Sequence, residues 1–280
     1  MSNVSQETHV GLSNSIWSDR LKNIIAISIV SLSVGINLTA PILVGQWIQY
    51  PFVGVLFEKN LVVSPVYYSL LFPYYRNINI DIAPPNQLQT INNVPVLSSH
   101  DLIDVLKYNS VNDKVHLTFT HADSEDIIDI TATLTSFPFI DLFMLFGVPY
   151  FIGLFYLGCA VSTIHWYGVK ETTKVFALFC ALFAILTGTI FDLLTYHYLS
   201  YIWIVTLPFI GASLAHLSLV FPVKPREIKR NTLLQYIPYT FALLLSIASV
   251  WETYTTGSFL TFPNYGILLL FFLPSLFLSA

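Results

Sequence analysis

Apolar segments long enough to cross a lipid bilayer recur along this chain of 280 residues, and they constrain its fold more than any other feature. A helix needs about 20 apolar residues to span the hydrocarbon core. Hydrophobic residues make up 55% of the chain and charged residues only 10%, with a mean hydropathy of +0.67. This composition is typical of a membrane protein. We expect an α-helical polytopic membrane protein with about six transmembrane helices, at residues 24–44, 142–164, 175–195, 199–221, 233–251 and from near Tyr265.

The N-terminal and C-terminal residues predict a cytoplasmic tail and an incomplete helix, respectively. Residues 1–23 are polar and lack a small-residue cleavage pattern, so we expect a cytoplasmic tail followed by a retained first helix. The last apolar segment, residues 265–280, is shorter than a full span and is followed by no charged residue. We therefore expect an incomplete sixth helix within residues 142–280, and a longer polypeptide that continues in the cytoplasm.

Lysine and arginine in the short loops predict the orientation. The loops at residues 196–198 and 252–264 contain neither residue. Cytoplasmic loops carry the excess of positive charge, so the N-terminus should be cytoplasmic and residues 52–136 should lie outside the membrane. The charges that support this orientation are Arg20, Lys22, Lys170, Lys174, Lys224, Arg226, Lys229 and Arg230.

Residues 52–136 change in character and predict a small α+β domain between the first two helices. In residues 114–120, Val115, Leu117 and Phe119 alternate with polar residues, and residues 126–134 alternate in the same way. Period-2 alternation predicts half-buried antiparallel strands, here joined by a turn at residues 121–125.

Capping and turn signals complete this domain. Ser98 or Ser99 can cap a helix over residues 100–108. Asn92-Asn93 tolerates positive φ and fits a tight turn after a strand at Gln87–Ile91.

The stretch "NQLQTINNVPVLSSHDLIDVLKYNSVNDKVHLTFTH", followed by "DIIDITATL", resembles the second half of a bacterial PDZ domain. That family has a strand, an Asn-Gly-x-Pro-Val turn, a Ser-x-x-Asp-Leu helix and two closing strands. The resemblance implies that Gly54, Val55, Leu56 and Phe57 form a carboxylate-binding loop beside the helix that begins near His100. It further implies an extended peptide or a protein C-terminus as partner, with His100 against a peptide hydroxyl.

Two other interpretations of the domain stay open: a PDZ-shaped spacer, or a contact in a homodimer, with an unused groove. Nine acidic residues face four basic ones in residues 52–136, which disfavours nucleic acid or an anionic lipid surface as partner of this domain.

Two ionisable residues fall inside or at the edge of expected spans, where such groups are costly and often functional. Asp192 is expected within a turn of the outer end of the third span. It needs a compensating partner or must stay protonated, and it is either a ligand-binding or proton-sensing group or a hydrated interfacial residue. His216 lies near the inner end of the fourth span, where Gly211 and Ala215 indicate close helix packing rather than catalysis.

The function is expected to be sensory. "LAHLSLVFPVKP" at residues 214–225 resembles the end of a membrane segment in multi-pass bacterial sensor proteins, including histidine kinases. This resemblance implies the plasma membrane of a bacterium, no catalysis by the residues present, and an output domain beyond residue 280. A freestanding membrane scaffold is the alternative.

Enzyme and transporter functions are less favoured. The sequence has neither a His-Glu-x-x-His motif nor a Gly-x-Gly-Asp motif, and it shows no internal repeat. Cys159 and Cys180 both lie in apolar segments, which indicates small buried residues rather than a disulfide framework or a metal cluster. We expect no cofactor and no metal.

Overall fold

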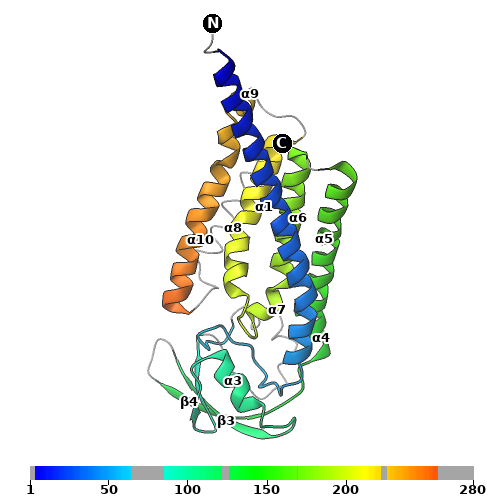
Figure 1. Ribbon diagram of the computed structural model, residues 1–280. Coiled ribbons are helices and arrows are strands. Elements are labelled where there is room, and N and C mark those ends of the chain that lie inside the picture. Colours follow the sequence, from blue (N-terminus) through cyan, green and yellow to red (C-terminus); the bar gives the residue numbers. More distant parts are fainter. Residues whose placement is uncertain (1–3, 65–84, 122–125, 169, 222–225, 258–280) are drawn as a thin grey trace.

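The computed structural model describes residues 4–64, 85–121, 126–168, 170–221 and 226–257. A bundle of long helices carries a small domain with an antiparallel sheet at one end, and the N-terminus lies at the other (Figure 1). Five helices are long and apolar enough to cross a membrane, and each overlaps one of the first five predicted spans. They are Arg20–Trp47, Phe139–Tyr167, Glu171–Gly188, Ser200–Val220 and Leu233–Thr256. The predicted sixth span lies outside the described residues.

The bundle is built from five main helices and several short ones. The first helix continues well beyond its apolar part. The bounds are α1 Val4–Trp47, α4 Phe139–Leu142, η2 Phe143–Gly147, α5 Val148–Tyr167, α6 Glu171–Gly188, α7 Ile190–Leu193, α8 Ser200–Val220, α9 Arg226–Arg230, η3 Thr232–Tyr236 and α10 Ile237–Thr256.

The third span ends earlier than the sequence predicts. Helix α6 ends at Gly188, and the short helix α7 follows it as a separate element. The hydroxyl of Thr189 donates to the carbonyl oxygens of Ile185 at 2.8 Å and Leu186 at 3.1 Å, and at Leu186 it takes the place of the next helical N–H. Asp192 therefore lies in α7, beyond the span, and not inside it.

A π-helix precedes the proline of the second span. Residues Phe143–Gly147 form η2, and Pro149 stands in the first turn of α5. Proline has no N–H to donate and its ring crowds the preceding turn, and such sites often widen locally into a π turn. The irregularity lets one continuous span form across Pro149.

The small domain has four antiparallel strands in the order β2-β1-β3-β4 and one helix, α3 Ser99–Leu106. The two predicted alternating strands are confirmed, and Leu117 pairs with Ile130 across them. The predicted turn at residues 121–125 lies almost wholly outside the described residues. The strand bounds are β1 Gln87–Ile91, β2 Val94–Pro95, β3 Lys114–Thr120 and β4 Ile127–Thr133.

The alternating residues form the core of this domain. Val115, Leu117 and Phe119 are fully buried and pack with Leu106 of α3. Asn92-Asn93 joins β1 to β2 with φ of 51° and 63°, as predicted for a two-residue hairpin turn.

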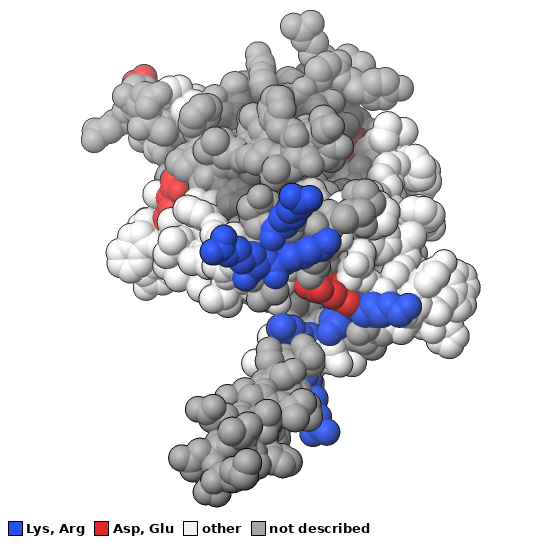
Figure 2. Space-filling view, turned by 90° about the horizontal axis from the view of Figure 1, so that it is seen from above, with Lys and Arg blue, Asp and Glu red and all other residues white. Residues whose placement is uncertain are grey.

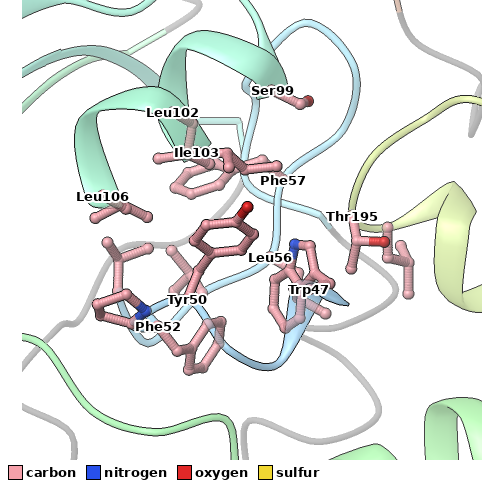
Figure 3. A pocket seen from close by; sticks show the side chains of 14 residues that line it. Trp47, Tyr50, Phe52, Leu56, Phe57, Ser99, Leu102, Ile103, Leu106 and Thr195 are labelled. Atoms are coloured by element: carbon pink, nitrogen blue, oxygen red, sulfur yellow. The ribbon is translucent and has the colours of Figure 1, made fainter. Parts of the chain in front are cut away.

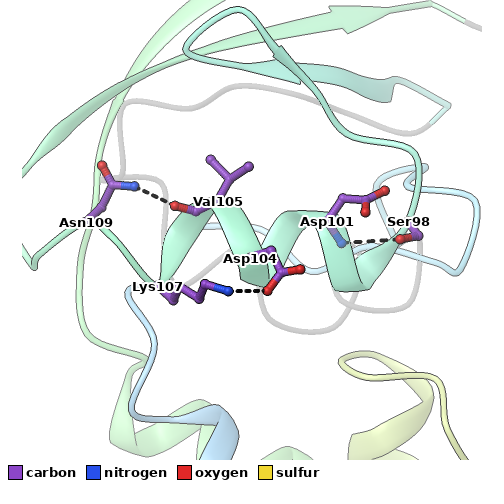
Figure 4. A network of polar contacts seen from close by, with 6 residues as sticks. All are labelled: Ser98, Asp101, Asp104, Val105, Lys107 and Asn109. Atoms are coloured by element: carbon purple, nitrogen blue, oxygen red, sulfur yellow. Dashed lines mark hydrogen bonds and ion pairs between the residues drawn. The ribbon is translucent and has the colours of Figure 1, made fainter.

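Helix α3 has its own capping network (Figure 4). The Ser98 hydroxyl accepts a hydrogen bond from the Asp101 N–H at 3.2 Å, and Asp101 Oδ2 accepts one from the Leu97 N–H at 3.0 Å. The hydrogen bond from Ser98, first among several causes, lowers the pKa of Asp101. The predicted cap at Ser98 is confirmed, and it fixes where α3 begins relative to the bundle.

Candidate functional site

A small cavity lies where the domain meets the bundle. Figure 3 shows side chains of α3 on one side and those of Trp47, Tyr50 and Phe52 on the other. Its volume is about 30 Å³, which holds one water molecule but no amino-acid side chain. Its walls come from both parts of the protein: Trp47, Tyr50, Pro51, Phe52, Val53, Val55, Leu56, Phe57, Ser99, Leu102, Ile103, Leu106, Leu194 and Thr195.

The predicted carboxylate-binding loop forms one wall of this cavity. Gly54 has φ of 98°, a conformation that side chains other than hydrogen rarely permit. Val55, Leu56 and Phe57 are buried. Within the described part of the chain, the N–H groups of these three residues donate to no acceptor. The structure thus brings residues 55–57 and α3 to one cavity, and it leaves the N–H groups of these three residues without an acceptor in the described ranges.

Alternate side chains of this loop face different partners. Val55 and Phe57 pack in the domain core, whereas Leu56 packs in a second cluster with bundle residues that include Leu194. The aromatic centre of that cluster is Trp47 at the end of α1. The loop is therefore held between the core of the domain and the end of the bundle that the domain covers.

Aromatic rings tie the second cluster together. The ring centroid of Trp47 lies 4.9 Å from that of Phe137 and 5.4 Å from that of Phe191, both edge-on. Phe52 lies 4.9 Å from Phe137 in the same manner. Such edge-to-face pairs contribute beyond their buried area. The cluster joins α1, the two chain segments that enter and leave the domain, and α7.

Two more contacts connect the domain to the bundle. The His100 ring at the start of α3 lies edge-on, 5.1 Å between centroids, against Tyr198 in the loop between α7 and α8. Lys59 donates to the Tyr201 hydroxyl of α8 at 2.9 Å and lies 4.4 Å from the centre of that ring. Displacement of α3 or of the turn at Lys59 would disturb the bundle directly.

Two buried titratable residues lie in this region, Asp192 in α7 and His197 in the loop after it. Asp192 is 5% exposed; its Oδ2 accepts from the Leu199 N–H at 2.7 Å, and its Oδ1 has no partner among the described residues. Burial raises the pKa of Asp192 to about 6, against the effect of its backbone hydrogen bonds. His197 has φ of 63°, and burial lowers its pKa to about 3.

The surroundings of Asp192 limit what it can bind. It borders a cavity of about 10 Å³, lined mainly by apolar residues of α1, α6, α7 and the loop between α7 and α8. Such a space holds at most one water molecule. The hydrogen-bond partner of Asp192 is the backbone N–H of Leu199, and not the side chain of Tyr196 or His197, which are the titratable residues nearest to it in sequence. The predicted ligand-binding or proton-sensing role stays a prediction.

His216 lies at the opposite end of the bundle from this site. It is buried, and its Nδ1 lies 3.1 Å from the Tyr239 hydroxyl of α10. Gly211 and Ala215 are also buried in α8, as helix packing predicts. The structure does not bring His216 together with Asp192 or with the domain.

Sequence reasoning missed the bundle half of the site. Tyr198 and the other aromatic residues near the ends of the spans were interpreted as anchors in the membrane interface. No sequence pattern predicted a contact of Lys59 with the bundle. The one available signal was the aromatic density of residues 196–203, which cover the end of the loop before α8 and its first turn and contain no lysine or arginine.

No protein-family model, curated protein or solved structure matches the chain. Among the described residues, no group of three or more His, Cys, Asp or Glu side chains is placed to hold a metal ion. The site is therefore interpreted from its own geometry.

Proposed function

We propose that this chain is the sensory input module of a bacterial membrane receptor. Its outer domain takes up an extended peptide or a protein C-terminus, and the helices relay that event to a histidine-kinase-like output. The observation that carries the proposal is the double packing of the loop at residues 54–57. Val55 and Phe57 lie in the domain core, and Leu56 lies in the cluster at the end of the bundle.

The loop has the chemistry to hold a peptide carboxylate. Unpaired backbone amides are the donors with which proteins build anion sites, and a peptide that adds alongside them gains main-chain hydrogen bonds. The cavity of about 30 Å³ is too small for a side chain, so an occupant must push α3 away from the loop.

Movement of α3 provides the relay. His100 lies in the first turn of α3, and its ring packs on Tyr198. When α3 shifts, this contact either breaks or moves the loop between α7 and α8 with it. A ligand shifts such an equilibrium by its difference in affinity for the two states. Here the affinity differs because only the opened state has room for the ligand.

The experiment places a reporter at the end of the bundle that carries α9. Lys229→Cys, in a background with Cys159 and Cys180 replaced by alanine, is labelled with an environment-sensitive dye in lipid nanodiscs. The probe is a pool of short peptides with an apolar C-terminal residue and a free carboxylate; the amidated pool is the control. We expect saturable binding and a change in emission with the free-carboxylate pool alone.

The same experiment can contradict the proposal. Tyr198→Ala should retain peptide binding and lose most of the emission change. Binding without any change at Lys229 in the unaltered chain would refute the relay and favour the scaffold. No binding would refute the peptide groove.

The orientation is a separate part of the proposal. Cysteines introduced at Asp113 in the domain and at Lys229 in α9 should react with a membrane-impermeant maleimide from opposite sides of intact cells. Reaction of both from one side would overturn the single-crossing topology.

A further inference from the structure

We propose that the end of the bundle opposite the domain holds a binding site for the phosphate of an anionic membrane lipid, formed jointly by α9 and by the part of α1 where its apolar span begins, at Arg20 and Lys22. Figure 2 shows lysine and arginine side chains gathered on this end of the molecule. The basic patch that we assign to the site consists of Arg20, Lys22, Arg226, Lys229 and Arg230.

Helix α9 presents its charges on one side. Arg226, Lys229 and Arg230 are spaced three and four residues apart and are exposed, whereas Ile228 is buried. Residues at this spacing share a helix face. The five-residue helix is thereby anchored by one apolar residue and turns three cations outward.

Residues 20–22 of α1 are brought to the same place through η3. Lys22 Nζ lies 5.8 Å from the centre of the Tyr236 ring in η3, and α9 packs against η3. Segments about 200 residues apart in the sequence thus contribute to one patch. Residues 19–22 and 226–230 together hold five basic residues against two acidic ones, Asp19 and Glu227.

The position of the patch favours a lipid phosphate over a soluble one. The candidate spans Arg20–Trp47 and Leu233–Thr256 begin at or just after the patch, so its charges lie at the depth of the headgroups. The exposed side chains of Leu21, Ile24 and Leu233 stand beside it and can cover acyl chains. A lipid carries a phosphate next to acyl chains, so it fits basic side chains that stand next to exposed apolar ones. Each basic residue beside a membrane attracts anionic lipid by about 1 kcal/mol.

The test compares two variants that each lose two charges at this end. The purified chain is reconstituted in phosphatidylcholine vesicles, and electron paramagnetic resonance measures immobilised spin-labelled phosphatidylglycerol and phosphatidylcholine. We expect Lys229→Gln/Arg230→Gln to reduce the preference for phosphatidylglycerol by on the order of fivefold or more. The matched control Lys170→Gln/Lys174→Gln, between α5 and α6, should change it much less.

Two further arms define the site. Lys22→Gln should also reduce the preference, because the site is composite; an unchanged preference would refute the contribution of α1. Millimolar inorganic phosphate should not displace the immobilised lipid; displacement would assign the site to a soluble phosphate. Equal losses in the two paired variants would overturn the local site, provided that both chains unfold at the temperature of the unaltered chain.

Discussion

Replacing Asp192 by asparagine should expose a dependence of stability on pH that the unaltered chain conceals. The Asp192 carboxyl has a pKa of about 6 in the folded chain and an ordinary value of 3.8. Between these values the unfolded chain has released the proton and the folded chain retains it. Stability therefore falls as the pH rises through this window, by about 3 kcal/mol at about 1.4 kcal/mol per pKa unit.

His197 contributes with the opposite sign. Its pKa is about 3 in the folded chain and 6.5 in its ordinary state, so between these values only the unfolded chain binds the proton. Stability then rises with pH by up to about 5 kcal/mol. Where the two windows overlap, between about pH 4 and 6, the two slopes cancel in the unaltered chain.

Two single variants separate these slopes. In Asp192→Asn the His197 slope remains, and the free energy of unfolding should rise by about 1.4 kcal/mol per pH unit between about pH 4 and 6. In His197→Asn the Asp192 slope remains, and the free energy should fall at the same rate. Asparagine is chosen at residue 197 because it tolerates the positive φ of 63°.

The assay is denaturant unfolding in mild detergent micelles at a series of pH values, followed by tryptophan fluorescence. Groups elsewhere titrate equally in all three chains and cancel when the variants are compared with the unaltered chain. Equal slopes in the three chains would refute the assignment of the two titrations. Slopes of the reversed sign would refute the burial argument on which it rests.

Four other substitutions test the cap of α3 and the space around three glycines. Ser98→Ala should destabilise α3 by about 1 kcal/mol through loss of its cap, measured by amide hydrogen exchange within the helix. Gly257→Ala should cost about 1 kcal/mol or more in the free energy of unfolding, because φ is 69° and the new Cβ would lie 2.8 Å from Cβ of Asn60. Gly153→Ala should cost about 1–3 kcal/mol because its Cβ would collide with a hydroxyl of α6, whereas Gly158→Ala, which meets nothing within 4 Å, should be neutral. Equal costs at the two α5 positions would contradict the packing of α5 on α6.

Local patterns predict the elements of this chain well. The alternation of Val115, Leu117 and Phe119 sets a strand and its buried face, because a strand places successive side chains on opposite sides. Asn92-Asn93 predicts its turn, because both residues tolerate positive φ. Apolar length alone predicts five spans to within a few residues, except at Gly188, where a threonine hydroxyl competes for the helix backbone.

Contacts between the domain and the bundle follow from no local pattern. Leu56 stands in a continuous apolar run, so its sequence gives no sign that it leaves the domain core for the cluster around Trp47. Tyr198 is nearly 100 residues from His100, and its aromatic ring fits a membrane interface as well as a protein contact. Only the assembled structure decides between these environments.

Helix α1 runs without interruption over 44 residues, from Val4 to Trp47. At 1.5 Å per residue it is about 66 Å long, more than twice the hydrocarbon thickness. Trp47 is fixed in the aromatic cluster under the domain, so a tilt of about 5° about that point would sweep the far end through about 6 Å. A small tilt at the end of α1 near the domain therefore moves its opposite end by about the 5.4 Å length of one helical turn.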